Sequence, residues 1–422
     1  MKKVLFLSFY WPPSGKASIH WPIKMIKYLP EFGWEPSVLT VKEDTFSAAD
    51  ETLFKDINPG LKVYKTSFWD PFIIYKKLLG KPPESSLSAS EVMSTENKGI
   101  VERLSLWIRL NLFIPDARVG WVIPGFRDAK KLLKHEKFDL IVSNGPPHST
   151  HLLALKLKKE FNIPLVSVFI DPWVDISYYK GLKRSKRVLK KDNTFEKKVI
   201  ENSDSLIFVT DGLIEYFETK YPGIRGKTNL LYWGYNEENF EQIKGFRKET
   251  RDYKILLHAG NIFDHQNPKK LWASINQEIN SGNKIIIRFI GTVSPGVKKS
   301  IEEHGLTPHT EYKGFLPYNE MLKEMLGADY LLVCATEPRH VPGKLFEYMR
   351  TGNKVLAFGD DNEEVKKILN NSGSGNLHSY SSDAAEFFAE NKKTEPNLSE
   401  IKKFDRKVIA EKLGKILNKT LE

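Results

Sequence analysis

The feature that most constrains this chain is a repeated alternation of short apolar runs with amphipathic segments. Runs rich in Val, Ile, Leu and Phe recur through the 422 residues, and most are followed by apolar residues at helical spacing. Buried strands separated by helices are typical of parallel sheets covered by helices. The sequence therefore predicts an α/β protein built from doubly wound parallel sheets.

The apolar runs fall into two groups, which predict two sheets. The first group lies at residues 3–9, 37–41, 61–66, 139–143, 164–170, 205–210 and 229–234. The second lies at residues 254–260, 284–291, 310–315, 330–335 and 354–359. Between them, residues 236–252 are polar and charged, as in a linker. We expect two Rossmann-like domains, residues 1–240 and 253–395, with a C-terminal helix over 399–419 that packs back on the first. Residues 83–99, rich in Ser and Glu, predict a surface loop.

Composition excludes several classes of protein. Cys334 is the single cysteine, so an intrachain disulfide is excluded, and its apolar neighbours predict a buried thiol. No apolar run reaches the ~18 residues that a membrane-spanning helix needs. The start, MKKVLFLSFYWPP, lacks a small-residue cleavage site, so it is interpreted as a first strand and not a secretory signal. The expected location is cytoplasmic, with peripheral attachment to the inner face of the membrane left open.

The net charge of +11 indicates a negatively charged partner. Nine Lys or Arg residues gather in 180–198, which predicts either a solvated helix face or a patch that meets an anionic membrane surface. Residues 101–113 also allow two interpretations, a helix packed in the core or a helix that lies at the membrane interface. Nucleic acid is not expected as a partner, because no nucleic-acid-binding motif accompanies the charge.

Ligands of doubly wound sheets bind at the carboxyl ends of the strands, so residues directly after the predicted strands are the candidate site. After the first strand, Gly15 and Lys16 open a helix and could accept a phosphate, although a plain turn is an equal alternative. His148 follows two prolines and could hydrogen-bond a sugar hydroxyl or remove its proton. Asp171 follows another strand beside Trp173, an aromatic surface suited to a sugar ring. The alternatives are a helix-capping cluster around His148 and a turn-capping role for Asp171.

The predicted second domain has similar strand ends. Gly260 and Asn261 end its first strand, Gly291 its second, and Phe315 and Leu316 follow its third. Glycine at such positions lets the backbone come close to a ligand, so these residues predict hydrogen bonds to a nucleotide base.

The stretch VPGKLFEYMRTGNKVLAFGD, 341–360, predicts a loop, a helix and a buried strand. If the helix begins near Pro342, the free N–H groups of Gly343 to Leu345 and the charge of Lys344 can hold an anion. Glu347, about one turn later, can accept hydrogen bonds from a ribose. The alternative is that Glu347 only interacts with the helix dipole.

Seven segments together resemble a known superfamily. They are FYWPPSGKAS, PDARVGW, SNGPPHSTH, FIDPW, VTDGLIEYF, LYWGYNEENF and VPGKLFEYMRTGNKVLAF. In order and spacing they resemble the retaining glycosyltransferases of the GT-B fold called glycosyl transferases group 1, or family four. The resemblance spans nearly the whole chain and implies two Rossmann-like domains that face a shared cleft.

The resemblance also implies roles for single residues. In that superfamily the last segment usually carries two glutamates separated by seven residues. The second holds the nucleotide ribose and corresponds to Glu347, whereas the first corresponds to Arg339, so half of the pair is missing. Basic residues that commonly neutralise the diphosphate are replaced here by Asn261 and Gln266. The charge of the phosphates would then be met by Lys344, Lys16 or Arg339.

The implied reaction transfers a sugar from a nucleotide-diphosphate sugar to a hydroxyl group with retention of configuration. No Asp-x-Asp occurs in the chain, so a metal-independent reaction without a further cofactor is expected. His148 and Asp171 would position hydroxyl groups, and the acceptor would be lipid-linked or a polysaccharide. One alternative is a nucleotide-sugar 2-epimerase, although NIFDHQNPKK, 261–270, lacks the His-Arg-x-Glu-Asn stretch of those enzymes. A non-catalytic module that docks on a membrane or a partner is the other.

Overall fold

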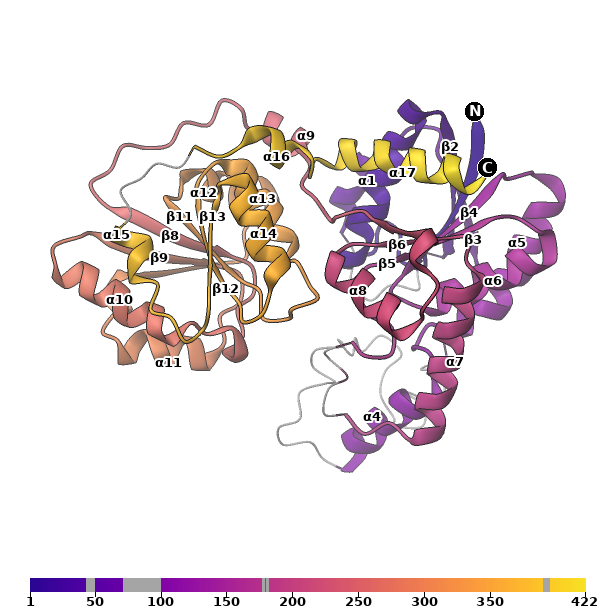
Figure 1. Cartoon of the computed structure of the whole chain (residues 1–422), viewed down its shortest axis with the longest axis horizontal. Coiled ribbons are helices and arrows are strands. Elements are labelled where there is room, and N and C mark those ends of the chain that lie inside the picture. The colour runs from indigo at the N-terminus through magenta and orange to yellow at the C-terminus, as the bar shows by residue number, and fades with distance from the viewer. Residues whose placement is uncertain (43–49, 71–99, 177–178, 180–181, 390–394) are drawn as a thin grey trace. The chain divides into compact units, whose positions relative to one another are not determined.

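The computed structural model describes residues 1–42, 50–70, 100–176, 179, 182–389 and 395–422. Residues 83–99, interpreted as a surface loop, lie outside these ranges. The chain divides into two compact units, which are described separately. Unit 1 comprises Met1–Val209, Leu213–Leu231 and Ala410–Glu422, and unit 2 comprises Thr210–Gly212 and Tyr232–Ile409. Figure 1 shows the elements of both.

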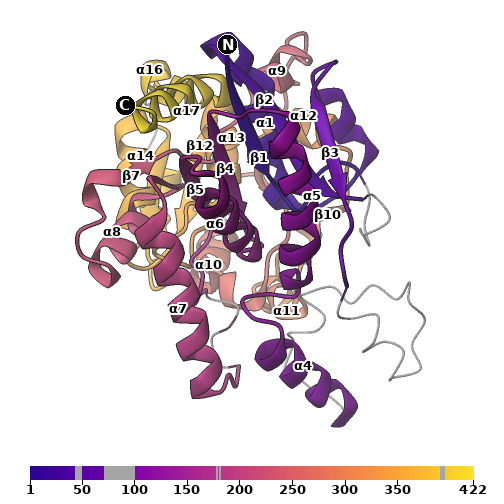
Figure 2. The ribbon, with the colours of Figure 1, turned by 90° about the vertical axis from the view of Figure 1, so that its right-hand side faces the viewer.

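Unit 1 contains a seven-stranded parallel sheet among its described residues, in the order β3-β2-β1-β4-β5-β6-β7. Its strands are β1 (Lys2–Leu7), β2 (Trp34–Val41), β3 (Lys62–Thr66), β4 (Leu140–Gly145), β5 (Leu165–Phe169), β6 (Ser205–Phe208) and β7 (Thr228–Leu230). Its helices are α1 (His20–Tyr28), α4 (Ile100–Leu112), α5 (Val122–His135), α6 (Ser149–Phe161), α7 (Lys186–Asn202) and α8 (Asp211–Lys220), whose first two residues belong to unit 2. Helices α5 and α6 pack side by side against this sheet (Figure 2).

Unit 2 contains a six-stranded parallel sheet, again among described residues, in the order β10-β9-β8-β11-β12-β13. Its strands are β8 (Lys254–Ala259), β9 (Ile285–Ile290), β10 (Thr310–Gly314), β11 (Tyr330–Cys334), β12 (Lys354–Phe358) and β13 (Gly375–His378). Its helices are α9 (Glu237–Glu241), α10 (Lys269–Asn280), α11 (Pro295–Glu303), α12 (Tyr318–Gly327), α13 (Gly343–Thr351), α14 (Glu363–Ser372), α15 (Ala385–Ala389) and α16 (Leu398–Lys402). Helices α10 and α11 cover one face, and α12, α13 and α14 the other (Figure 1).

Burial on both faces explains why the strands read as continuous apolar runs. In β1, Val4, Leu5, Phe6 and Leu7 are all fully buried, although successive side chains point to opposite faces. Strands covered by helices on both sides have no solvent face on which polar residues would be favoured. The parallel α/β fold class predicted from the sequence is confirmed.

The last helix, α17 (Arg406–Thr420), begins in unit 2 and continues in unit 1 from Ala410. Lys2 Nζ donates to Asn418 Oδ1 at 2.9 Å, and a Cβ atom at Gly414 would lie 3.1 Å from Phe32 Cβ. These contacts place the second part of α17 against the beginning of the chain.

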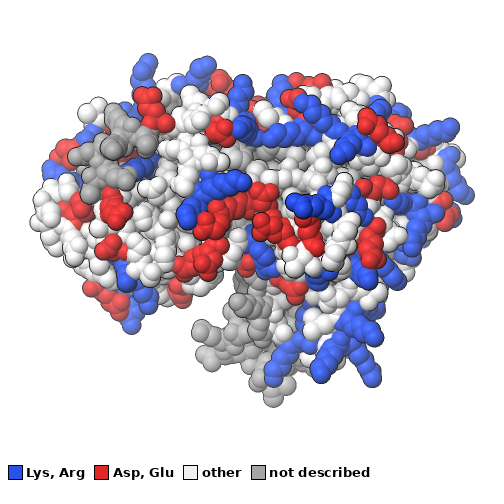
Figure 3. All heavy atoms as spheres, viewed as in Figure 1, with Lys and Arg blue, Asp and Glu red and all other residues white. Residues whose placement is uncertain are grey.

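Two elements depend on contacts that apolar periodicity does not show. Helix α7 begins at Lys186, because the Ser185 hydroxyl accepts from Val188 N at 3.3 Å and caps the helix. It therefore carries much of the basic cluster, and Lys and Arg side chains gather at its lower end in Figure 3. Strand β13 was not predicted, since its sequence GNLH has no apolar run; backbone pairing with β12 forms it. None of the described helices is long and apolar enough to cross a membrane.

Candidate functional site

In both units the strand order reverses beside the first strand, between β1 and β4 in unit 1 and between β8 and β11 in unit 2. Connections leave the sheet in opposite directions at such a point, so a crevice remains at the carboxyl ends of the strands. The predicted site residues were taken from loops at these ends.

At the carboxyl edge of unit 2, two glycines bring the backbone close to its neighbours. Gly260 and Gly291 have φ values of +123° and +105°, which L side chains rarely adopt. A Cβ atom at Gly260 would lie 1.8 Å from Lys344 Nζ, and one at Gly291 would lie 2.8 Å from the Gly260 carbonyl oxygen. A side chain at either position would meet Lys344 Nζ or the Gly260 backbone, so glycine is favoured at both. The hydrogen bonds to a nucleotide base stay a prediction.

Lys344 reaches back from α13 to this edge. Its ammonium group donates to the Ala259 carbonyl oxygen at the end of β8. Burial lowers the pKa of Lys344, and the negative charge of Glu347 opposes this effect. The charge lies beside the N-terminus of α13, where the helix dipole is also positive. This corner of unit 2 is thus suited to an anion.

Helix α13 begins at Gly343, with Pro342 at its N-cap, and no described side chain caps it. A Cβ atom at Gly343 would lie 2.8 Å from Trp233 Cδ1, so the first turn packs closely against an aromatic ring. One expectation is wrong: the N–H of Leu345 is not free, because it donates to the Pro342 carbonyl oxygen at 2.9 Å. The side chain of Leu345 is fully buried, so it supports the turn from inside the core.

Other predicted donor-binding residues have partners within unit 2. Glu347 Oε1 accepts from the Tyr318 hydroxyl at 2.6 Å, and burial together with Glu347 raises the pKa of Tyr318. Asn261 Oδ1 accepts from Thr292 N at 3.0 Å, which ties the loop after β8 to the loop after β9. Arg339 Nε pairs with Glu337 Oε1 at 2.9 Å. Sequence reasoning missed Tyr318, which no motif marked.

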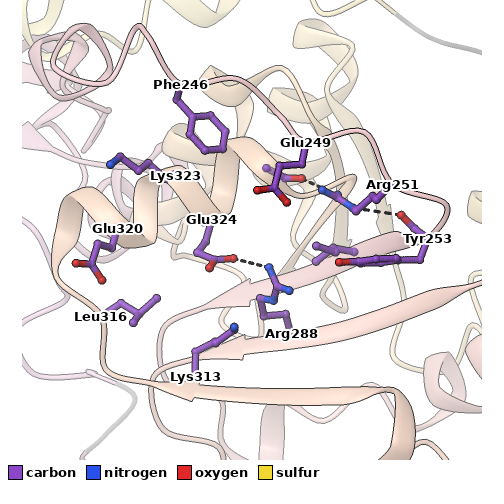
Figure 4. Close-up of a pocket in the computed structure, with 12 residues that line it drawn as sticks. Phe246, Glu249, Arg251, Tyr253, Arg288, Lys313, Leu316, Glu320, Lys323 and Glu324 are labelled. Carbon is purple, nitrogen blue, oxygen red and sulfur yellow. Dashed lines mark hydrogen bonds and ion pairs between the residues drawn. The ribbon is translucent and has the colours of Figure 1, made fainter.

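Phe315 and Leu316 follow β10 but differ in exposure. Phe315 is 91% exposed, whereas Leu316 lines a cavity of about 400 Å³ beside α12 and the amino end of β8 (Figure 4). In this cavity Arg288 pairs with Glu311 at 2.7 Å and with Glu324 at 2.5 Å. Because these charges neutralise one another, we do not assign a ligand to the cavity.

At the carboxyl edge of unit 1, Gly15 and Lys16 are exposed and precede a 3₁₀ turn at Ala17–Ile19. Asp171 is partly exposed in a bend directly after β5. Gly15 and Lys16 thus lie in the connection between β1 and α1, and Asp171 lies in the connection after β5; their roles stay predictions.

His148 and Trp173 are buried instead. His148 is 5% exposed at the start of α6 and stacks on Trp173, with ring centroids 4.9 Å apart and an interplanar angle of 7°. Burial lowers the pKa of His148 to about 3, so the ring is neutral near pH 7. Trp173 is 1% exposed, and its indole N–H donates to Asp192 Oδ1 at 2.7 Å. The expectation that Trp173 offers a surface to a sugar is wrong, since packing between His148 and α7 covers the ring.

The N-terminus of α6 is occupied by a carboxylate of the chain itself. Asp116 Oδ2 accepts from Ser149 N at 2.8 Å, and Oδ1 accepts from the Ser149 hydroxyl at 2.9 Å. Burial raises the pKa of Asp116, and the hydrogen bonds from Ser149 and Arg118 oppose that shift. The guanidinium of Arg118 lies over the rings of Phe9 and Tyr10. Sequence reasoning noted this PDAR segment but assigned it no role.

A second histidine, His151, ends a chain of buried hydroxyl groups. Ser203 donates its single proton to the Val199 carbonyl oxygen, so Ser167 must donate to Ser203, and Ser143 to Ser167. His151 Nδ1, 2.8 Å from the Ser143 hydroxyl, must therefore carry the proton and donate. The bonding chain thus leaves Nε2 as the unprotonated nitrogen, facing Gly145. Burial lowers the pKa of His151 well below its usual value, which keeps this neutral form.

Known proteins resemble this chain in family and in fold. Residues 91–239 match the family described as Glycosyltransferase Family 4. Sucrose-phosphate synthase from Thermosynechococcus elongatus is 13% identical with a TM-score of 0.64, covering 99% of both chains. Anabaena HepE in complex with UDP is 14% identical with a TM-score of 0.64, covering 99% of this chain and 100% of its own. A glycosyltransferase from Rickettsia africae is 12% identical with a TM-score of 0.61, covering 100% and 99%. No curated protein sequence matches the chain significantly.

At these identities the solved structures establish the fold alone: two parallel α/β sheets, as in GT-B-like folds. The family match covers β4, β5, β6 and β7, including the segments after β4 and β5 that carry His148 and Asp171. The resemblance stated from the sequence motifs is confirmed. Residues 91–239 of this chain are thus similar to glycosyltransferase family 4.

Proposed function

We propose that the chain transfers a sugar from a nucleotide-diphosphate sugar to a hydroxyl acceptor, with retention of configuration. One observation carries the proposal: the N-terminus of α13 has no described side-chain cap, and Lys344 lies beside it at the edge formed by Gly260. A helix N-terminus with an adjacent buried cation is suited to a diphosphate group.

The difficult part of such a transfer is the negative charge that develops on the departing diphosphate. The N–H groups of Gly343 and Lys344 and the ammonium group of Lys344 would stabilise that charge from fixed positions. Since Lys344 is largely surrounded by protein, its charge is screened less than that of a surface lysine. This arrangement requires no metal, and the leaving phosphate itself can accept the proton of the acceptor hydroxyl.

Glu347 is proposed to bind the nucleotide ribose. In the present structure its carboxylate accepts from Tyr318, which leaves further oxygen lone pairs for ribose hydroxyl groups. The absent first glutamate, at Arg339, means that another group must contact the donor sugar. The solved complexes of Anabaena HepE contain UDP and UDP-glucose, which makes a uridine nucleotide the first candidate to test.

On the acceptor side, His148 and Asp171 are proposed to orient hydroxyl groups. His148 is neutral and fixed by its stacking on Trp173, so it would act as a hydrogen-bonding group and not as a cation. A 2-epimerase remains the alternative of the same fold. It predicts that an N-acetylhexosamine nucleotide is epimerised without any acceptor, and that no sugar is transferred.

The experiment is a thermal-shift screen of the purified chain with UDP, GDP, ADP, CMP and dTDP and their common sugars. A ligand at 100 times its dissociation constant should stabilise the protein by roughly 2.7 kcal/mol. We expect one nucleotide family to raise the melting temperature, and Lys344→Met and Glu347→Ala to abolish the rise. Lys366→Met, an exposed lysine on α14 that pairs with Glu363, is the matched control. No shift with any nucleotide would refute the proposal and favour the non-catalytic docking module.

We further propose that unit 1 attaches to an anionic membrane surface. Trp107 and Leu112 on α4 are 50% and 61% exposed, and Lys186 and Arg187 at the start of α7 are also exposed. Asn111 joins the two helices, since its Oδ1 accepts from Ser185 N at 2.9 Å. Exposed aromatic and aliphatic side chains beside basic ones are typical of surfaces that bind anionic lipid.

Co-sedimentation with vesicles tests this attachment. We expect binding to vesicles of phosphatidylglycerol with phosphatidylcholine and not to phosphatidylcholine alone. Replacing Lys186 and Arg187 by Gln should weaken binding by roughly 1 kcal/mol per charge, whereas the same change at exposed Lys298 and Lys299 on α11 should not. Equal binding to both vesicle types would contradict the proposal that the attachment depends on negative lipid charge.

A further inference from the structure

A buried arginine of unit 1 has hydrogen-bond donors that no residue in the described ranges uses. The side chain of Arg184 is 5% exposed, and its Nη2 pairs with the Asp192 carboxylate. Its Nε and Nη1 are also buried, and neither has a partner among the described residues. Buried donors are normally paired, because an unpaired one loses its water without compensation. Arg184 therefore points to a ligand that supplies oxygen acceptors.

Asp192 cannot be the whole explanation for Arg184. Its Oδ2 accepts from Arg184, and its Oδ1 accepts from the Trp173 indole at 2.7 Å, so both oxygens are already engaged. The ion pair thus fixes one part of the guanidinium and leaves Nε and Nη1 for another group. An arginine held in place in this way is pre-organised for a phosphate, whose oxygens match guanidinium donors.

The surroundings of Arg184 favour an anion. Its guanidinium lies 4.9 Å from the centroid of the Tyr179 ring. Burial raises the pKa of Tyr179 to about 12; the negative charges of Asp116 and Asp192 add to that rise, and the positive charges of Arg184 and Arg109 oppose it. Lys183 and Lys186, next to Arg184 in the chain, are exposed. Together these cations raise the local concentration of an anionic ligand.

An apolar surface lies next to this charge. Asn111, near the end of α4, accepts from Ser185 N at 2.9 Å and donates to the Lys183 carbonyl oxygen at 3.4 Å, so α4 packs against the residues on either side of Arg184. The same helix exposes Trp107 and Leu112. A ligand with a phosphate group and an apolar chain would match both features.

The position of Arg184 also fits the acceptor side of the proposed reaction. Asp192 connects Arg184 to Trp173, and Trp173 stacks on His148. An anionic group held by Arg184 would therefore be separated from His148, the proposed hydroxyl-orienting residue, only by the side chains of Asp192 and Trp173.

We propose that Arg184 binds the phosphate or diphosphate group of an acceptor whose apolar chain lies along Trp107 and Leu112. This inference rests on the proposed function, because it names the acceptor class of the same reaction. It differs from membrane attachment in requiring a specific buried donor and not only surface charge.

The test is calorimetric titration of the full chain with geranyl diphosphate, inorganic pyrophosphate and uncharged geraniol. Geranyl diphosphate should bind most tightly, pyrophosphate more weakly, and geraniol not measurably. Arg184→Lys keeps a cation for Asp192 but loses the guanidinium donors, so it should fold and weaken geranyl diphosphate by at least about tenfold. Lys159→Gln, at an exposed lysine on α6, is the control and should change it by less than about threefold. The combined Trp107→Ser and Leu112→Ser variant should weaken geranyl diphosphate but not pyrophosphate.

The outcomes separate the two proposals, provided that UDP-induced stabilisation is measured on the same variants. Equal affinity of wild type and Arg184→Lys would overturn the Arg184 site, as would the failure of both phosphates to bind while UDP still stabilises the protein. Pyrophosphate binding as tightly as geranyl diphosphate would keep the anion site but overturn the apolar chain, and would indicate a water-soluble phosphorylated acceptor. Binding of geranyl diphosphate without any nucleotide effect would support the site and refute the proposed transfer.

Discussion

In both units the strand order reverses beside the first strand, but the helix N-termini at the carboxyl edges of the two sheets have different neighbours. In unit 1 the helix after β4, α6, has its N-terminus filled by the Asp116 carboxylate. In unit 2 the helix after β11, α13, has no described side-chain cap and has Lys344 beside it. In unit 1 the Asp116 carboxylate already occupies the helix N-terminus, so this edge has a structural role. In unit 2 the Lys344 ammonium group lies beside the helix N-terminus, so this edge is suited to an anionic ligand.

The glycines of the two edges show the same contrast. Gly145 in unit 1 faces His151 and His148, so the missing side chain makes room for the chain's own packing. Gly260 in unit 2 faces the end of the Lys344 side chain, so the missing side chain preserves a charged position. Substitution of the first should therefore affect stability, and substitution of the second should affect ligand binding.

The largest effect is expected for Gly260→Ala. A Cβ atom 1.8 Å from Lys344 Nζ would displace the ammonium group, and we expect nucleotide affinity or kcat/KM to fall about 100-fold. Gly282→Ala is the matched control, since Gly282 also has a positive φ of +98° but no atom within 4 Å of its Cβ position. Equal losses in both variants would attribute the effect to backbone strain and break the comparison.

Gly145→Ala should act on stability instead. Its Cβ would lie 2.3 Å from His151 Nε2 and 2.9 Å from His148 Nδ1, both on buried rings that cannot move freely. Overpacking of this kind typically costs 1–3 kcal/mol, so we expect the free energy of unfolding to fall by about 2 kcal/mol. Gly226→Ala, with no atom within 4 Å, should be nearly neutral. Chemical denaturation measures both, and the fractional saturation of folded protein by nucleotide should not change.

Acid should destabilise unit 1 more than unit 2. Burial lowers the pKa of His148 and of His258 to about 3, and that of His151 well below its usual value. Between those values and about 6.5 the unfolded chain binds more protons, so this stability is complete above pH 6.5 and is lost as the pH falls. Each of His148 and His258 should cost about 2 kcal/mol at pH 5 relative to pH 7.

Unit 1 contains two of these histidines and unit 2 contains one, so acid should lower the stability of unit 1 more than that of unit 2. Asp116 in unit 1 and Glu364 in unit 2 have pKa values raised by burial, and so oppose the loss in both units. Hydrogen exchange at pH 5 and pH 7, corrected for the intrinsic rate, should show a larger loss of protection in α6 than in α13. A larger loss in α13 would contradict the prediction.

The smallest effect is expected for Tyr318→Phe. Removing the hydroxyl that donates to Glu347 at 2.6 Å frees one carboxylate oxygen but lets the side chain move. We expect nucleotide affinity to weaken about threefold, as for one hydrogen bond at a positioned acceptor. Tyr312→Phe, on β10 with a 44% exposed side chain, is the control. A tenfold or larger change would mean that Tyr318 itself contacts the nucleotide.

Much of the fold could be predicted from residue patterns, because apolar runs of strand length have few alternatives to burial on both faces. The buried environment of Cys334 was predicted for the same reason and is confirmed at 6% exposure. The pattern failed where backbone pairing decides, as in β13, and it does not include the side-chain cap at Ser185 that starts α7. Neither the backbone pairing of β13 nor the hydrogen bond of the Ser185 cap can be predicted from hydrophobic periodicity.

For the candidate site, the sequence could predict which residues follow the strands, but not how their side chains pack. Strand-end residues such as Gly260, Lys344 and Asp171 could be identified because parallel strands end at one edge. The burial of Trp173 and the bond from Leu345 N to the Pro342 carbonyl could not, since both depend on how neighbouring segments pack.

By itself, the sequence determined the parallel α/β class, the places where strands end and the residue types available there, because these follow from apolar periodicity and from glycine, proline and charge. Only the tertiary structure decided which of those residues meet a ligand position and which are used internally. Asp116 and Lys344 show the difference: each lies beside a helix N-terminus, but the Asp116 carboxylate accepts from Ser149 N of α6, whereas the Lys344 ammonium group donates to the Ala259 carbonyl at the end of β8. That outcome depends on distances between segments far apart in the chain, which no local pattern encodes.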